Sequence, residues 1–308
     1  MTASQKILTL ITPEKSSILT SETLSELATT LKTTTGTTTD APIWLAEAVA
    51  VDLPLTSNAG ELEETAITES LKGWIKDRPI DFAITASDKR RKKLLISDMD
   101  STIIQEECID EIAFMAGIKP RIAGITERAM RGEIEFDDAL RERVGLLKGL
   151  ETTALETVIK ERLNISPGAR TLVRTMAANG AYCALVSGGF TFFTDRIAKL
   201  TGFHTTQANQ LEIKDDKLTG NVIPPILGSA AKKHALESYL TEKGLEAESS
   251  LAVGDGANDL EMIRIAGLGV AYRAKPIVAA EAKAAVTHTD LTSLLYMQGY
   301  RKSEFIET

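Results

Sequence analysis

Two aspartates separated by one residue lie where a buried strand is expected to end. Asp98 and Asp100 follow the apolar run Leu94–Ile96, which is typical of a parallel strand that delivers side chains to the ligand-binding edge of an open α/β sheet. Residues two apart in an extended chain point the same way, so the two carboxylates could share a metal ion or a phosphate. Taken alone, the pattern is also typical of a strand followed by an aspartate-capped turn.

Other small polar or charged residues lie at the ends of further expected elements. They are Ser187–Gly188–Gly189 after a strand at 182–186, the segment from Gly254 to Asp259 after a strand at 251–253, and Lys232 on a helix at 229–243. Together with the aspartate pair they supply carboxylates, a hydroxyl in a glycine turn and an ammonium group. Because a Gly-Asp-Gly segment alone indicates only a tight turn, the interpretation depends on the whole set.

The elements between these ends predict an α/β fold with a Rossmann-like parallel sheet core. Helical patterns lie at 106–116, 121–131, 136–147 and 152–162. With no strand pattern between them, we expect a helical cap at about 104–165, inserted after the first strand of the sheet. Strand and helix patterns alternate again from Pro167, with a pair of short strands at 205–223 and a last helix near 290–297.

Residues 1–88 are expected to form a separate, small α+β domain. Its expected elements are strands at 6–12, 43–55 and 80–84, helices at 21–31 and 60–76, and a threonine-rich loop at 33–40. This order resembles the ACT-like regulatory modules of amino-acid enzymes, and an oligomerisation or stabilising domain is the alternative. The five basic residues 89–93 are interpreted as a solvated linker or as the lead-in to a strand, and they mark the domain boundary, so the second domain is 89–308.

Composition limits the class of protein and its partners. A chain of 308 residues with 43% hydrophobic residues and a net charge of −8 is typical of an acidic globular protein, and the charge disfavours nucleic acid and anionic membranes. No run reaches the roughly 18 apolar residues of a membrane span, so we expect a cytoplasmic location. Cys108 and Cys183 stand in no metal-type spacing, which indicates neither a disulfide framework nor a zinc site. A homodimer is a further expectation.

The order of the motifs resembles that of a known superfamily. D-x-D-S-T, S-G-G, a lone lysine and G-D-G-x-N-D occur in the same order in the haloacid dehalogenase superfamily of aspartate-nucleophile phosphatases, and the resemblance spans about residues 93–295. Within it, the segments at 98–113, 140–147, 186–190 and 253–259 are similar to the phosphoserine phosphatases. The resemblance implies magnesium-dependent hydrolysis of O-phosphoserine to serine and phosphate through an aspartyl-phosphate, the last step of serine biosynthesis.

The same resemblance implies a role for each acidic residue. Asp98 is the expected nucleophile, and Asp100 the expected general acid and base. Magnesium, which prefers oxygen ligands, is expected on the side chains of Asp98 and Asp255 and on the backbone carbonyl of Asp100. Asp259 is expected to support this metal site indirectly, through water or Asn258.

Substrate contacts are expected from three further places. Ser187, the Gly188 amide and Asn258 are expected to bind the phosphoryl oxygens, and Lys232 the phosphoryl group and nucleophile, with the adjacent Lys233 as the alternative.

The cap is expected to recognise the amino-acid part of the substrate. Glu107 matches the residue that binds the ammonium group and Arg143 the one that binds the carboxylate, with Arg141 as the alternative. Met130 and Phe136 could form an apolar lid or could belong to the helical core.

Two other functions stay open at this point. An aspartyl-phosphate can be captured by an alcohol other than water, such as homoserine, which would make the chain a phosphotransferase. Alternatively, the chain could be a catalytically retired amino-acid sensor that works through residues 1–88. The presence of Asp98, Asp100, Lys232 and Asp255 argues against the sensor.

Overall fold

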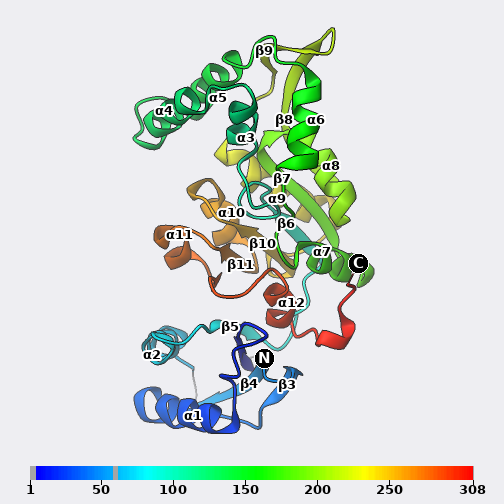
Figure 1. Ribbon diagram of the computed structural model, residues 1–308. Helices are drawn as coiled ribbons and strands as arrows, with labels where there is room; N and C mark the ends of the chain where they lie inside the picture. The colour runs from blue at the N-terminus through cyan, green and yellow to red at the C-terminus, as the bar shows by residue number, and fades with distance from the viewer. Residues whose placement is uncertain (1–4, 58–61, 308) are drawn as a thin grey trace.

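The structure is a computed structural model that describes residues 5–57 and 62–307. Its strands are β1 (Lys6–Ile11), β2 (Thr37–Thr39), β3 (Ile43–Ala46), β4 (Ala50–Ser57), β5 (Asp81–Ala86), β6 (Leu94–Ser97), β7 (Tyr182–Phe190), β8 (Thr205–Lys214), β9 (Lys217–Ile223), β10 (Ser250–Gly254), β11 (Leu268–Tyr272) and β12 (Ala284–Val286). Across the described residues they form one continuous sheet in the order β2-β4-β1-β5-β12-β11-β10-β6-β7-β8-β9, with β3 beside β4. Figure 1 shows this sheet running through the length of the molecule.

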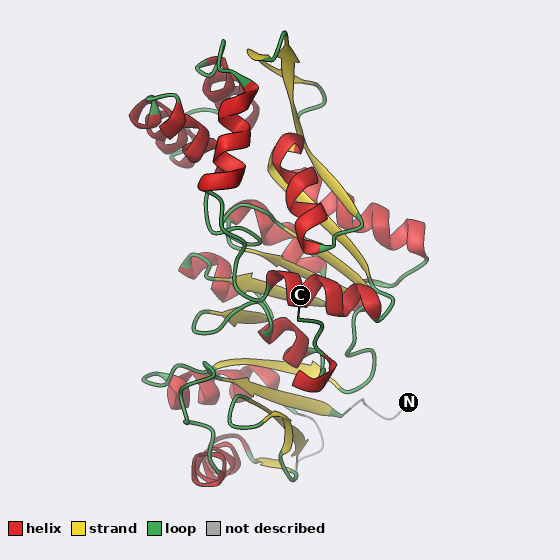
Figure 2. Ribbon diagram, turned by 45° about the vertical axis from the view of Figure 1, so that its right-hand side comes forward, coloured by secondary structure: helices red, strands yellow, loops and turns green. Residues whose placement is uncertain are grey.

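Helices cover the sheet and form its two ends. They are α1 (Ser21–Thr35), α2 (Glu64–Ile75), α3 (Cys108–Met115), α4 (Lys119–Met130), α5 (Phe136–Gly145), α6 (Thr152–Glu161), α7 (Ala169–Ala178), α8 (Thr191–Thr201), α9 (Ser229–Lys243), α10 (Leu260–Ile265), α11 (Pro276–Glu281) and α12 (Ser293–Met297). Helices α1 and α2 lie at one end of the molecule and α3, α4 and α5 at the other (Figure 2). Helices α10 and α11 and strand β12 were not expected from the sequence.

The central part of the sheet is parallel, as predicted. β6 pairs with β7 on one side and with β10 on the other, and β10 pairs with β11. All residues of β6 and β10 are buried, which is typical of strands covered on both faces. In the register, Ser97 of β6 lies opposite both Leu185 and Val253. The residues that follow these strands therefore meet at one edge of the sheet.

The cap consists of the predicted helices together with a hairpin. Helices α3 to α6 fall within the predicted range 104–165. The strands β8 and β9 are longer than expected and extend beside α5 and α6 (Figure 1). Gly149 and Thr152 donate backbone hydrogen bonds to Leu218 and Asp216 of the hairpin, so the hairpin supports the cap.

The N-terminal strands belong to the same sheet as the parallel strands. β5 pairs antiparallel with β12, and so joins the N-terminal strands to the parallel part of the sheet. One face of these strands packs against α1 and α2 through a leucine-rich core that includes Leu8 and Leu27. Ile11 and Ala83 belong instead to the main core. The ACT-like interpretation and the boundary at 88/89 stay predictions.

The threonine-rich loop predicted at 33–40 is wrong. Helix α1 continues to Thr35, and β2 begins at Thr37. The hydroxyl groups of Thr33 and Thr34 donate to the carbonyl oxygens four residues earlier, so these side chains make their hydrogen bonds within the helix. Gly36, with a φ of 69°, ends the helix.

Two further N-terminal predictions change in detail. The strand expected at 43–55 is a hairpin, in which β3 and β4 are separated by a turn that contains Ala48 at a φ of 56°. The helix expected at 60–76 is observed as α2 from Glu64, and residues 60 and 61 lie outside the described residues.

Lys89, Arg91 and Lys93 of the basic run are exposed, as predicted, but Arg90 and Lys92 are not. Arg90 donates to both carboxylate oxygens of Asp52 at 2.6 and 2.7 Å, to the Thr9 hydroxyl at 2.6 Å and to the Met297 carbonyl at 3.0 Å. Only 10% of its side chain is exposed. The Lys92 ammonium donates to two backbone carbonyls, those of Lys89 and Glu248. The run therefore ties the N-terminal strands to the sheet and to α12.

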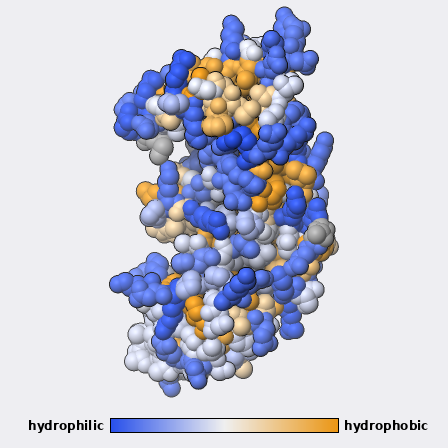
Figure 3. All heavy atoms as spheres, viewed as in Figure 1, coloured by the Kyte–Doolittle hydropathy of each residue, from blue (hydrophilic) through white to orange (hydrophobic). Residues whose placement is uncertain are grey.

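In the part of the chain that the structure describes, no helix combines the length and the apolar character that crossing a bilayer requires. The face seen in Figure 3 is mainly hydrophilic, and hydrophobic residues gather there in separate patches, one of them over the cap.

The Asp52–Arg90 ion pair predicts a measurable contribution to stability. Asp52→Asn should lower the free energy of unfolding by about 3 kcal/mol, because the Arg90 charge stays buried without a carboxylate. A urea titration measures this change. Lys72→Ala, which breaks the exposed pair with Glu69, should change it by less than about 1 kcal/mol. Equal effects of the two substitutions would contradict the role given to Arg90.

Candidate active site

The site is built around a buried lysine that contacts two aspartates. Lys232 of α9 lies 2.8 Å from Oδ2 of Asp98 and 2.6 Å from Oδ1 of Asp259. The exposed fractions are 2% for Lys232, 5% for Asp98 and 0% for Asp259. Burial opposes the charge on Lys232, but the two carboxylates outweigh it and raise the pKa of the ammonium group. Lys233 makes no such contact and is only half-buried, so the geometry favours Lys232.

Three carboxylates gather at the ends of β6 and β10. Oxygens of Asp98, Asp255 and Asp259 lie within 4.8 Å of one another. Burial raises the pKa of Asp98 well above its ordinary range, and the charges of Asp259 and Asp100 add to the effect. Burial, together with the charge of Asp259, also raises the pKa of Asp255 to about 6. Lys232 balances only one of these negative charges, so the set fits a divalent cation that prefers oxygen ligands.

Asp259 has a more direct role in the geometry than predicted. Its Oδ1 contacts Lys232, and its Oδ2 accepts the Gly256 backbone N–H at 3.1 Å. The prediction that it acts only through water or Asn258 is therefore incomplete. Asn258 itself is exposed. A Cβ on Gly254 would overlap the carboxyl group of Asp259, so this tight arrangement requires glycine at 254.

Asp100 lies beside Ser187, on the neighbouring strand end. Its Oδ1 accepts the Cys108 backbone N–H at 2.8 Å, and its Oδ2 accepts the Ser187 hydroxyl at 3.2 Å. Burial raises the pKa of Asp100, and these hydrogen bonds oppose the shift. A carboxyl group that keeps its proton to a higher pH is suited to donate it to a leaving group.

Both cysteines, Cys108 and Cys183, are buried and free.

The Ser187–Gly189 segment, predicted to follow a strand at 182–186, lies within β7 and directly beneath a cap side chain. A Cβ on Gly188 would stand 3.4 Å from the Phe136 ring, and one on Gly189 would stand 2.9 Å from Oδ2 of Asp100. Phe136, at the start of α5, therefore covers the turn and fits the predicted lid. The side chain of Met130 lies outside the described residues.

Glu107 and Arg143 stand in the same electrostatic neighbourhood, with neither paired to an opposite charge among the described residues. Glu107 accepts the Ser101 hydroxyl at 2.6 Å, and Arg143 donates to the Ala139 carbonyl at 3.2 Å. The surrounding protein and the charge of Asp100 raise the pKa of Glu107 to about 7. Burial lowers the pKa of Arg143, and the charge of Glu107 opposes that shift. Arg141 is exposed, whereas Arg143 is half-buried.

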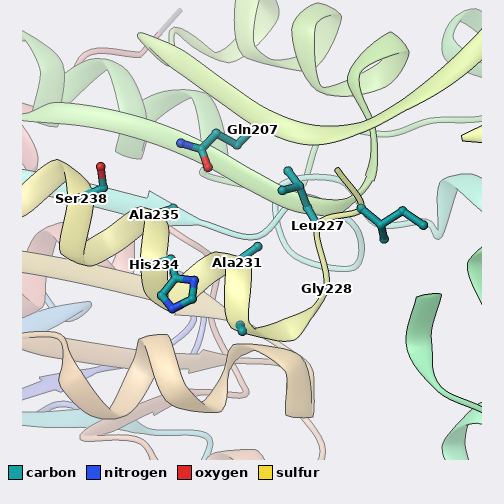
Figure 4. A pocket seen from close by; sticks show the side chains of 9 residues that line it. Gln207, Leu227, Gly228, Ala231, His234, Ala235 and Ser238 are labelled. Carbon is teal, nitrogen blue, oxygen red and sulfur yellow. The ribbon is translucent and has the colours of Figure 1, made fainter. Parts of the chain in front are cut away.

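A separate hollow of about 400 Å³ lies between β8 and α9. Figure 4 shows Gln207 on the strand, His234 and Ser238 on the helix, and Leu227 on the segment that leads into the helix. None of the three clustered carboxylates lines this hollow. The segment at 226–228 forms part of its lining.

More than half of the chain matches a known hydrolase family. Residues 95–264 match the haloacid dehalogenase-like hydrolase family, and the chain belongs to that family. Within it, the chain is 45% identical over 204 residues to the phosphoserine phosphatase of Streptococcus thermophilus, an alignment that covers 66% of this chain and 94% of the relative.

A second relative and a crystal structure are also similar to this chain. It is 41% identical over 227 residues to the phosphoserine phosphatase of Streptomyces coelicolor, which covers 73% of this chain but only 55% of that relative. The chain thus spans about half the length of that relative. A crystal structure of a probable phosphoserine phosphatase from Vibrio cholerae matches with a TM-score of 0.75 at 32% identity, over 98% of this chain and 88% of that one.

The carboxylate cluster predicts a pH-dependent response to magnesium. Mg²⁺ at about 100 times its Kd should raise the unfolding temperature by roughly 5 °C at about pH 8. The rise should shrink as the pH falls through about 6, because Asp255 then takes up a proton that the cation must displace.

A thermal-shift measurement at several pH values tests this response, with Asp255→Asn as the control. Because the pKa of Asp255 is raised to about 6, its ionised, metal-binding form predominates above about pH 6. A rise that is the same at about pH 5, or that persists in Asp255→Asn, would show that the cation binds elsewhere.

Proposed function

We propose that this chain is a magnesium-dependent phosphoserine phosphatase that forms an aspartyl-phosphate on Asp98. The observation that carries the proposal is the buried Asp98–Lys232–Asp259 contact with Asp100 on the neighbouring turn. Phosphoserine phosphatases among the relatives support the choice of substrate.

In the first half-reaction, Asp98 is the nucleophile. One carboxylate oxygen of Asp98 forms a bond to phosphorus while the bond from phosphorus to the serine oxygen breaks. Asp100, whose pKa is raised by burial, gives its proton to the departing serine oxygen. Lys232 lies 2.8 Å from Asp98, where its charge offsets that of the phosphoryl oxygens.

In the second half-reaction, Asp100 acts as a base. It takes a proton from water as the water oxygen attacks phosphorus, the bond to Asp98 breaks, and inorganic phosphate leaves. The Ser187 hydroxyl, which now donates to Asp100, is placed to donate to a phosphoryl oxygen instead. The Gly188 amide and Asn258 are proposed as further contacts of the phosphoryl group.

The residues present fit a magnesium ion. Asp98, Asp255 and the backbone carbonyl of Asp100 are proposed to hold it, while Asp259 is engaged by Lys232 and Gly256. When bound, the ion would supply positive charge to the phosphoryl oxygens.

Selectivity for phosphoserine is proposed to come from the cap. Arg143 would bind the substrate carboxylate through its guanidinium fork, and Glu107 would bind the ammonium group. Neither forms an ion pair with another described residue, so a zwitterionic ligand can pair with each. Phe136 would close the site over the glycine turn and keep water out.

The remaining proposals concern context. The proposed activity fits a cytoplasmic enzyme that converts the last intermediate of serine biosynthesis into serine. An ACT-like role for the N-terminal strands and a homodimer are also proposed, and a thermal-shift measurement of the full chain with added amino acids tests the first.

A substrate panel tests the proposed activity. With Mg²⁺, kcat/KM for phosphoserine should exceed that for sugar phosphates by about 100-fold or more, since only phosphoserine engages Arg143 and Glu107. A chelator should abolish turnover, and Asp98→Asn should lower kcat by about 10⁴-fold or more. Equal turnover of sugar phosphates would contradict the substrate, and phosphohomoserine formed in the presence of homoserine would indicate a phosphotransferase.

The role of Arg143 is tested by a matched pair of substitutions. Arg143→Ala should raise the KM for phosphoserine by about 10- to 100-fold, because a charged hydrogen-bonded contact to the carboxylate is lost. Phosphoethanolamine, which lacks that carboxylate, should be hydrolysed equally by Arg143→Ala and wild type. Arg141→Ala should leave both substrates unaffected; a larger effect there would move the role to Arg141.

A further inference from the structure

A buried asparagine joins two loops of the site. Asn209 of β8 has an exposed fraction of 0%. Its side-chain N–H groups donate to the Gly188 carbonyl at 2.8 Å and to the Leu227 carbonyl at 3.3 Å. Its side-chain oxygen accepts the Leu227 backbone N–H at 2.7 Å. All three contacts are to backbone atoms, so the residue holds loops rather than side chains.

The strand ladder cannot hold the Gly188 loop by itself. Between β7 and β8 the register passes from Val186 opposite Gln207 to Phe190 opposite Asn209. Three residues of β7, Ser187 to Gly189, are therefore opposed by one residue of β8, and they form a bulge in the ladder. The Asn209 side chain supplies a hydrogen bond to this bulge in place of the ladder.

The second loop leads directly to the catalytic lysine. Leu227 is followed by Gly228, and α9 then begins at Ser229, one turn before Lys232. The hollow lined by Gln207, Leu227 and Gly228 lies along this segment (Figure 4). The segment thus borders a hollow, and its two hydrogen bonds to the Asn209 side chain help to fix its position.

The two loops also share one neighbour in the cap. A Cβ on Gly188 would stand 3.4 Å from the Phe136 ring, and one on Gly228 would stand 3.5 Å from it. The loops therefore form one floor beneath the lid, and their separation sets the space in which a phosphoryl group can lie between Ser187 and Lys232.

We infer that Asn209 is a positioning residue that fixes the distance between the Ser187–Gly188 turn and the helix that carries Lys232. Only an amide side chain matches its partners, because two carbonyls need donors and one N–H needs an acceptor. The inference rests on the proposed function and adds to it a residue that touches neither substrate nor nucleophile.

Asn209→Asp tests the inference with almost no change in shape. The carboxylate still accepts from Leu227 but repels the two carbonyls, so the loops should separate. We expect kcat/KM for phosphoserine to fall about 100-fold. Inhibition by inorganic phosphate should weaken about tenfold, whereas inhibition by serine, which contacts the cap, should stay within about twofold. A residue needed only for folding would not separate these two inhibitors in the folded protein.

The controls make each outcome decisive. Asn179→Asp, which loses a donor to the Thr175 carbonyl at the end of α7, should keep wild-type kinetics. Should Asn209→Asp not fold by circular dichroism, Asn209→Ser is used for the same comparison. Unchanged kcat/KM in the folded variant, or equal losses of phosphate and serine inhibition, would overturn the inference.

Failure of the proposed function gives a different result. In that case the wild type would fail to hydrolyse phosphoserine but would hydrolyse another phosphomonoester. The Asn209→Asp comparison is then made on that substrate with the phosphate arm alone, where a weakened inhibition still supports the positioning role and an unchanged one overturns it.

Discussion

The contact of Lys232 with Asp98 and Asp259 is the interaction on which the site depends. One ammonium group is buried against two carboxylates, and Asp255 brings a third carboxylate within 4.8 Å. Buried charges are costly unless they are paired, and here the negative charges outnumber the positive one. The arrangement is stable only if protons or a cation supply the missing charge. This imbalance suits the strand ends to a divalent ion, and it supports the proposal that Asp98 is the nucleophile.

The fold supplies this contact through the register of parallel strands. Because Ser97 lies opposite Val253, Asp98 and Gly254 follow at the same edge, and α9 passes over them with Lys232. The cap and the β8–β9 hairpin then cover the edge, with Phe136 over the glycine turn. Arg90 ties the N-terminal strands to α12, because it contacts both Asp52 of β4 and the Met297 carbonyl.

The sequence predicted the elements whose signals are local. The acids after β6 and β10, the cap helices and helix α9 follow from apolar periodicity and from motif order. Long-range contacts could not be predicted. The choice of Lys232 over Lys233 depends on which face of α9 meets Asp98, and the basic run looked solvated because its partners, Asp52 and the Met297 carbonyl, are far away in sequence. The loop predicted at 33–40 was wrong because the threonine hydroxyl groups at the end of α1 donate to carbonyl oxygens within the helix. Asn209 was missed, although an asparagine inside an expected strand is a signal that such a polar side chain needs buried partners.

The most direct test of the account is whether Asp98 becomes phosphorylated. Wild-type protein with Mg²⁺ is mixed with radiolabelled phosphoserine, quenched in acid within one turnover, digested and mapped by mass spectrometry. The account predicts label on the peptide that contains Asp98, and none in Asp98→Asn. Label on another residue, or turnover of phosphoserine with no labelled protein at any quench time, would contradict it.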